Sequence, residues 1–321
     1  MKPKTTPSWK TRFWAVVKYE FLWNIRKKKF LGMFVIAFAL ATLSLILPIV
    51  LSNVVGQPLS QNPDYVARSG ISIGNFGMFL FAVVTVMNSI SGEFESGTIV
   101  PLLTKPVSRT MVFIGKLFAA VVTLLLAYAV IILYTTIGGI LVYGPQNNLH
   151  LVPLSLLGSI LSTFVWVAIV LAIGSISKNS LIAAIGTFGI FMALTMGASI
   201  ISVFSEQAWV LNYVPGSGAT GYIKGVPSDN PYAPGLAVST GTDSIAANIV
   251  NYALYPSANV TYVTINLFAA GQPSSVSELY TELYAEPLSL VIIRSIGVAA
   301  AYTIAFLFLS WYAFKRAQVL E

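Results

Sequence analysis

Few residue types in this sequence could support catalysis. There is no cysteine, which excludes thiolate nucleophiles, zinc–thiolate sites, iron–sulfur clusters and disulfides. The one histidine, His150, falls in a short loop between apolar runs, so neither a His-based triad nor a His-paired metal site can form. We therefore expect a protein that is not an enzyme by itself and holds no metal.

The sequence offers no convincing nucleotide-binding motif. Gly216, Gly218 and Gly221 spell GxGxxG, but a dinucleotide site requires a strand before this motif and a helix after it. Here the motif follows a long apolar run, so we interpret it as a turn. The sequence has no GxxxxGK[ST] motif, and we expect no cofactor in this chain because it cannot cradle ATP phosphates in a P-loop.

The segment 92–116 carries the strongest functional signal. A short apolar run, 99–104, is too short to cross a membrane and is flanked by acidic residues before it and basic residues after it. Isolated carboxylates there have no obvious packing role, and an exposed apolar patch between charged hinges is typical of a protein-docking element. The candidate docking residues are Glu93, Glu95, Gly97, Thr98, Ile99, Leu102, Leu103, Pro106, Ser108 and Arg109.

The rest of the sequence is that of a membrane protein. Apolar residues make up 56% and charged residues only 9%, whereas about a quarter of a soluble domain is charged. A span needs about 20 apolar residues. We predict an all-α polytopic membrane protein with six transmembrane helices, at residues 31–52, 73–91, 111–142, 154–176, 181–204 and 288–314. The first is longer than the apolar core of a signal peptide, so we expect a permanent anchor.

The distribution of positive charge predicts the orientation. With the N-terminus in the cytoplasm, 15 of the 18 Lys and Arg residues lie on the cytoplasmic side, as the positive-inside rule requires. An even number of spans then returns the C-terminus to the same side. We expect a multi-pass protein of the plasma membrane, and no nucleic-acid partner, because the positive charge serves topology.

The predicted domains are 1–30, 31–204 with its loop 92–116, 205–287, and 288–321. Residues 8–30 combine aromatic residues at helical spacing with basic ones, which predicts an amphipathic helix in the headgroup layer, in contact with membrane lipid. A simple topogenic charge cluster is the alternative.

The segment 205–287 is expected to form an external subdomain. It contains a strand-like run at 259–268 and an amphipathic pattern at 276–284, where Ser275 and Glu278 form a capping box that predicts a helix. Asn259 begins an N-glycosylation sequon on the side predicted to be external.

The run GEFESGTIVPLLTKPVSRTMVFIGK, residues 92–116, resembles the signature of ABC-2 type permeases, the membrane subunits of ABC exporters. Lys18, Glu20 and Arg26 resemble part of the connecting helix of that family. In layout the chain is similar to stand-alone members such as the nitrous-oxide-reductase maturation permease group.

This resemblance implies a partner and a mechanism. The run 99–104 would be a coupling helix that docks on an ABC ATPase subunit, and Glu93 and Glu95 would form its hinge. ATP and Mg would be bound by that partner. A second permease copy or homologue would complete the pathway, and an amphipathic, lipid-like, peptide or drug-like cargo would move outward.

Two other functions remain open at this stage. An ion-coupled secondary carrier would need ionisable residues or broken helices inside the spans, and the span interiors carry almost no charge. A membrane scaffold, or a mechanotransmission subunit without cargo, would show no stimulated ATPase activity in any complex.

Overall fold

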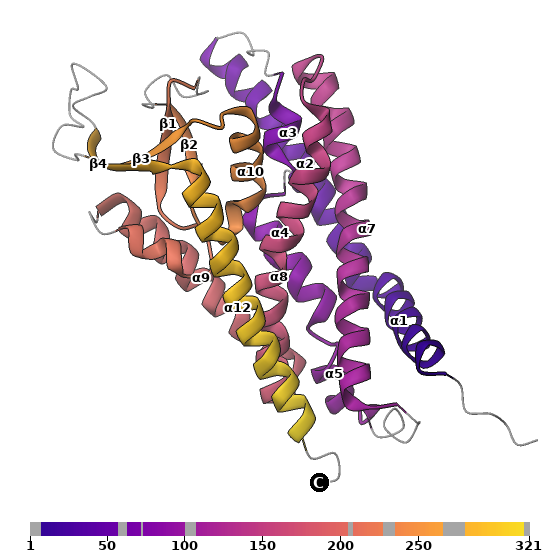
Figure 1. The fold of residues 1–321 in the computed structure, drawn as a ribbon. Coiled ribbons are helices and arrows are strands. Elements are labelled where there is room, and N and C mark those ends of the chain that lie inside the picture. Colours follow the sequence, from indigo (N-terminus) through magenta and orange to yellow (C-terminus); the bar gives the residue numbers. More distant parts are fainter. Residues whose placement is uncertain are drawn as a thin grey trace, which may run out of the picture.

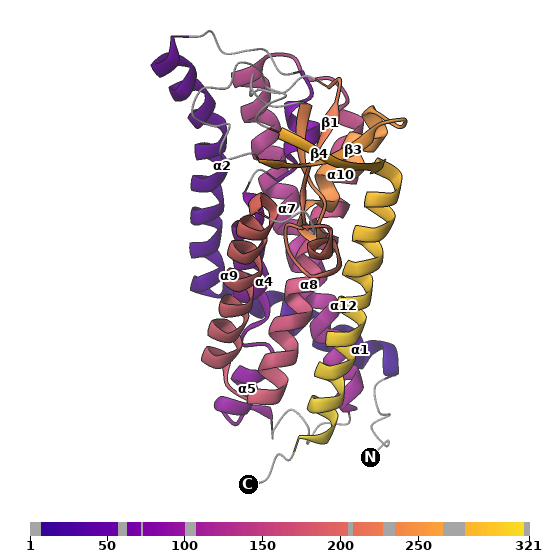
Figure 2. The ribbon, with the colours of Figure 1, turned by 90° about the vertical axis from the view of Figure 1, so that its left-hand side faces the viewer.

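The computed structural model describes residues 8–56, 63–71, 73–99, 107–204, 208–226, 235–265 and 280–317. Six helical segments in them are long and apolar enough to cross a membrane, which confirms the predicted spans. They form one elongated bundle (Figures 1 and 2). The span helices are α2 (Lys28–Val55), α4 (Gly74–Val86) continued by α5 (Ser91–Glu95), α7 (Arg109–Tyr143), α8 (Val152–Ser177), α9 (Ser180–Phe204) and α12 (Leu288–Arg316).

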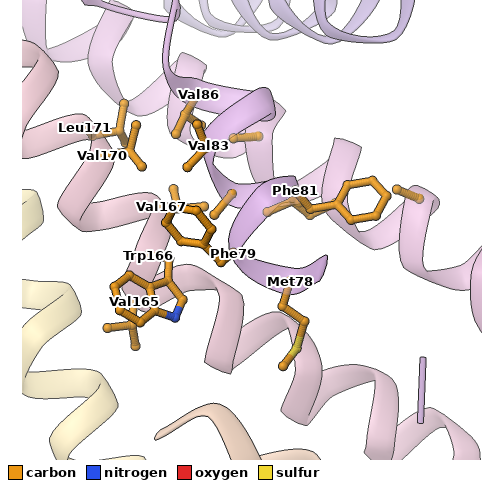
Figure 3. Packing of buried hydrophobic residues seen from close by; sticks show 14 of the residues in the cluster. Met78, Phe79, Phe81, Val83, Val86, Val165, Trp166, Val167, Val170 and Leu171 are labelled. Atoms are coloured by element: carbon orange, nitrogen blue, oxygen red, sulfur yellow. The ribbon is translucent and has the colours of Figure 1, made fainter. Parts of the chain in front are cut away.

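Helix α8 is the centre of the bundle. Of its most apolar stretch 67% is buried, against 17% for α2 and 22% for α12, so most of the surface of these two helices is not covered by the rest of the bundle. Trp166 of α8 packs edge-on to Phe79 of α4 at 5.7 Å and close to Phe191 of α9 (Figure 3). This aromatic cluster holds three spans together, since rings in such geometry add attraction to the area that they bury.

Helix α1 (Trp9–Arg26) precedes the first span and confirms the predicted amphipathic helix. Ser8 caps it, and at Lys27 the backbone becomes extended, which turns the chain into α2. Val16 packs against Gly115 of α7, where any β-carbon would collide with it. Four aromatic residues of α1 are exposed: Trp9, Trp14, Tyr19 and Trp23. Their location in a headgroup layer stays a prediction.

Between α9 and α12 the chain forms a four-stranded antiparallel sheet with the strand order β2-β1-β3-β4. Helix α10 (Ile245–Leu254) connects β2 with β3. The sheet lies at the end of the bundle opposite α5 (Figures 1 and 2). The strands are β1 (Thr220–Lys224), β2 (Gly235–Ser239), β3 (Asn259–Ile265) and β4 (Tyr280–Pro287).

The predicted strand at 259–268 is confirmed for its first seven residues, but the predicted helix at 276–284 is wrong for 280–284. These residues form β4 and pair with β3. Tyr280, Leu283 and Tyr284 suit a pleated surface as well as a helix face, and pairing with β3 decides between the two. Ser275 and Glu278, the expected cap, lie outside the described residues.

Two short 3-10 segments, η2 (Ala208–Tyr213) and η3 (Thr242–Ser244), flank the sheet residues on the bundle side. Gly216 and Gly218 between them have positive φ angles of 131° and 73°, which confirms a turn for the first two glycines of the GxGxxG motif, whereas Gly221 lies in β1. The amide of Asp243 donates to the Gly216 carbonyl, so the turn is fastened to η3.

Candidate functional site at the α5 end

One end of the bundle brings together parts of seven helices from distant regions of the sequence. It comprises α5, the first turns of α7, the junction of α8 and α9, the last turn of α12, and the end of α1 where it meets α2 (Figures 1 and 2). We call this region the α5 end. The helical pattern of α4 is interrupted at residues 87–90, and α5 then restarts with Glu93 in its first turn.

A buried ionic cluster joins three of these elements. Lys116 of α7 donates through Nζ to Glu20 Oε1 of α1 at 2.5 Å and to Glu93 Oε1 of α5 at 2.7 Å. Lys116 and Glu20 are each only 4% exposed. Buried charges have lost their hydration, so breaking such a pair is costly. The cluster therefore ties α1 and α5 to α7.

Lys27, at the corner between α1 and α2, adds a second cation beside this cluster. Its Nζ donates to Asn24 Oδ1 at 3.2 Å. Burial lowers the pKa of the Lys27 ammonium to about 8, and attraction by Glu20 opposes that shift. The corner is thus electrostatically linked to the cluster.

Glu95 fastens α5 to α9. One carboxylate oxygen accepts from the Ser180 amide at 3.0 Å and the other from the Ser180 hydroxyl at 2.5 Å. A carboxylate on the first amides of a helix satisfies donors that have no partner within the helix and interacts well with its dipole. The expectation that Glu93 and Glu95 have no packing role is wrong, because each holds another element.

Arg109 holds the end of α12. Its Nη1 lies within 3.3 Å of three main-chain oxygens, those of Phe314, Lys315 and Ala317, and donates to them. A cation suits the last carbonyls of a helix, which lack partners within it. Ser108, directly before, caps α7 by accepting from the Met111 amide at 3.1 Å. The residues that begin α7 therefore also hold the C-terminal end of α12.

The other predicted site residues are distributed as follows. Gly97, with φ of 67°, and Thr98 are exposed and form the expected break. Ile99 is 2% exposed and belongs to the main core, so its predicted place in an exposed patch is wrong. Ile99 directly follows the break at Gly97 and Thr98, and its side chain packs in the main hydrophobic core. Leu102, Leu103 and Pro106 lie outside the described residues.

The remaining predicted residues are those of the connecting helix and of the glycosylation sequon, and they differ in burial. On α1, Lys18 and Arg26 are exposed, while Glu20 is buried in the ionic cluster. Asn259 is exposed at the first position of β3.

Sequence reasoning missed Lys116 as the centre of the site. A signal was present in α1, where Val17, Glu20 and Asn24 follow helical spacing and are all buried. A carboxylate on the apolar stripe of a helix requires a cation from the surface against which it packs. Lys116 supplies it.

Among the described residues no group of three or more His, Asp or Glu side chains could hold a metal ion. The model of the ABC-2 family transporter protein matches residues 14–319. No curated protein of known function matches the sequence. The family match covers the six spans, the ionic cluster and the whole segment 92–116. The chain therefore belongs to the ABC-2 family of transporter proteins, as a multi-pass membrane permease.

Proposed function

We propose that the chain is the transmembrane subunit of an ATP-driven exporter and that a separate ATPase subunit, which binds ATP and Mg, docks at the α5 end. The observation that supports this most is the bonding of that end. Lys116 connects α5 to α1 and α7, Glu95 connects it to α9, and Arg109 connects α7 to α12. A force applied near 99–104 would reach four helices through these contacts.

The transport cycle that follows needs two permeases. ATP-driven closure of the ATPase pair would move both α5 ends and rock the permeases about a shared seam that holds the pathway. Helices α2, α9 and α12 offer wide apolar surfaces for lipid and for such a seam. An uncharged, aromatic-rich surface suits an amphipathic, lipid-like, peptide or drug-like cargo, and the outward direction rests on the family resemblance.

For orientation, we propose a plasma-membrane protein with both termini in the cytoplasm. In support, α1 and the last turn of α12 lie at the α5 end, away from the sheet (Figure 2). The absence of cysteine allows a direct test, because each introduced cysteine is unique. On intact cells a membrane-impermeant maleimide is expected to label Ser257→Cys, beside the sheet, and to spare Ser96→Cys at the α5 end. The reverse pattern would contradict the proposal, since no cytosolic ATPase could reach the α5 end.

The docking site is tested by purification with the partner. We expect a Walker-motif ATPase to copurify with the tagged chain and to lose that association in the double variant Leu102→Asp/Leu103→Asp. Leu149→Asp is the matched control, because it places the same charge on an exposed leucine of the short segment before α8. If the double variant keeps the ATPase, the docking assignment is refuted.

Two measurements separate this function from the alternatives. Transport in proteoliposomes by the permease–ATPase complex should require ATP and survive collapse of ion gradients, whereas an ion-coupled carrier would behave in the opposite way. A scaffold or mechanotransmission subunit would transport none of the amphipathic probes offered.

A further inference from the structure

The segment between β2 and α10 inserts deeply into the bundle. Trp166 lies 14 residues into α8, so it is about 20 Å from the start of that helix and near its middle. Its Nε1 donates at 3.1 Å to Oδ1 of Asp243 in η3. Three residues before Asp243, the carbonyl of Thr240 accepts a hydrogen bond from Ser295 of α12 at 2.8 Å. Asp243 is thus held among membrane-spanning helices.

No described residue forms an ion pair with the Asp243 carboxyl. It is 4% exposed, and its Oδ2 has no hydrogen-bond partner among the described residues. The packed elements α4, α8, α9 and η3 contribute no other ionisable side chain. The ionisable side chain of η2 is Tyr213, and that of α10 is Tyr252. On α12 the ionisable side chains are Arg294, which is paired with Glu286, and, farther along the helix, Tyr302, Tyr312, Lys315 and Arg316.

Burial raises the pKa of Asp243 from 3.8 to about 7, although hydrogen bonds from Trp166 and Thr242 act in the opposite direction. Charged and neutral forms are therefore both accessible near neutral pH.

A polar stripe on α8 leads to this carboxyl. Ser155, Ser159, Ser162 and Trp166 follow one another at spacings of four, three and four residues, which places them on one face of an otherwise apolar helix. Within the part of the chain that the structure describes, three buried polar atoms have no hydrogen-bond partner: Ser155 Oγ, Ser162 Oγ and, on α10, Asn251 Oδ1. Buried polar atoms of this kind are normally satisfied by ordered water. The stripe, packed against α10 and η3, thus has the chemistry of a hydrated seam.

We infer that Asp243 is a proton-binding site, reached through this seam, and that proton uptake stabilises η3 in its buried position among α8, α10 and α12. The neutral acid keeps the Trp166 bond on Oδ1, and its new O–H on Oδ2 donates to seam water. Loss of that proton to water leaves a carboxylate that must draw in further water, which loosens η3. The proposal does not depend on an ATPase partner.

The experiment uses the purified chain in lipid nanodiscs without any ATPase. Infrared spectra recorded between pH 4.5 and 9 are expected to contain a protonated-carboxyl band that titrates near pH 7, remains in Asp64→Asn and is lost in Asp243→Asn. Because the folded-state pKa is above the unfolded one, stability should fall as pH rises from about 4 to about 7. The thermal midpoint of the native chain should accordingly be lower at pH 8 than at pH 5, with a smaller difference in Asp243→Asn.

If Asp243→Asn fails to fold, Trp166→Phe is decisive, because loss of the N–H donor should shift the titration to higher pH. A band that persists in Asp243→Asn, or titrates below pH 5 in the native chain, overturns the proposal. The proposal would also be overturned if sodium, but not potassium, restored the thermal midpoint at pH 8, since the site would then bind a cation.

Discussion

Replacing Lys116 by Met removes the cation of the ionic cluster and keeps the apolar length of its side chain. Glu20 and Glu93 are then left near each other without the bonds of 2.5 and 2.7 Å. Side-chain exposure is 16% for Glu93 and 6% for Glu20, so Glu93 can turn toward solvent, whereas Glu20 stays buried with only the attraction of Lys27 and is stabilised by taking up a proton. Protonating an ordinary glutamate costs about 3.7 kcal/mol at pH 7 and about 1 kcal/mol at pH 5.

Lys116→Met should therefore lower the free energy of unfolding by about 3–5 kcal/mol at pH 7, the usual cost of breaking a buried pair, and by much less at pH 5. The measurement is reversible unfolding in mixed micelles at both pH values. Combining the substitution with Glu20→Gln removes the stranded charge and should recover about half of the loss at pH 7.

The control is Lys224→Met, which breaks the Lys224–Glu282 pair on the sheet. That pair has the same distance of 2.5 Å, but its side chains are 47% and 58% exposed. Its loss should cost less than about 1 kcal/mol. A cost for Lys116→Met as small as that of the control, or no recovery with Glu20→Gln, would refute the view that burial makes this cluster obligatory.

Three further predictions concern other contacts. Arg109→Ala should accelerate amide hydrogen exchange in the last turn of α12 at least several-fold, with little change at its first turn, because three carbonyls lose their donor. Gly158→Val should lower the free energy of unfolding by more than about 3 kcal/mol, because a β-carbon at this position would collide with the backbone of α10. Gly297→Val is the control: no atom lies within 4 Å of a β-carbon there, so the free energy of unfolding should change by less than about 1 kcal/mol. Thermal unfolding measures both. Arg294→Met should strand the buried Glu286 and release the sheet from α12, which limited proteolysis of the sheet would detect.

The spans could be predicted because a bilayer imposes a simple rule, about 20 apolar residues per crossing, and every predicted interval overlaps its helix closely. That rule does not say which span is central. Helix α8 and helix α2 have similar mean hydropathy, yet only α8 is largely buried, a difference that depends on contacts with distant segments.

The candidate site was predicted in position but not in its bonding. The spacing around Glu93 and Arg109 indicated a hinge, whereas the partners Lys116 and Ser180 come from other helices. The error at 280–284 has the same origin. Local periodicity favoured a helix, and pairing with β3, which no local pattern contains, made the residues a strand.

Helix α12 is held near both ends. Beside the sheet, its Arg294 is paired with Glu286, and at its last turn main-chain carbonyls accept hydrogen bonds from Arg109. The 20 residues from Arg294 to Phe314 make a rod about 30 Å long. A tilt of about 5° at one of these ends would displace the other by about 3 Å, enough to change which side chains touch. If α12 tilts as a rigid rod, a displacement at one face of the membrane would be transmitted to the other without any side chain having to cross.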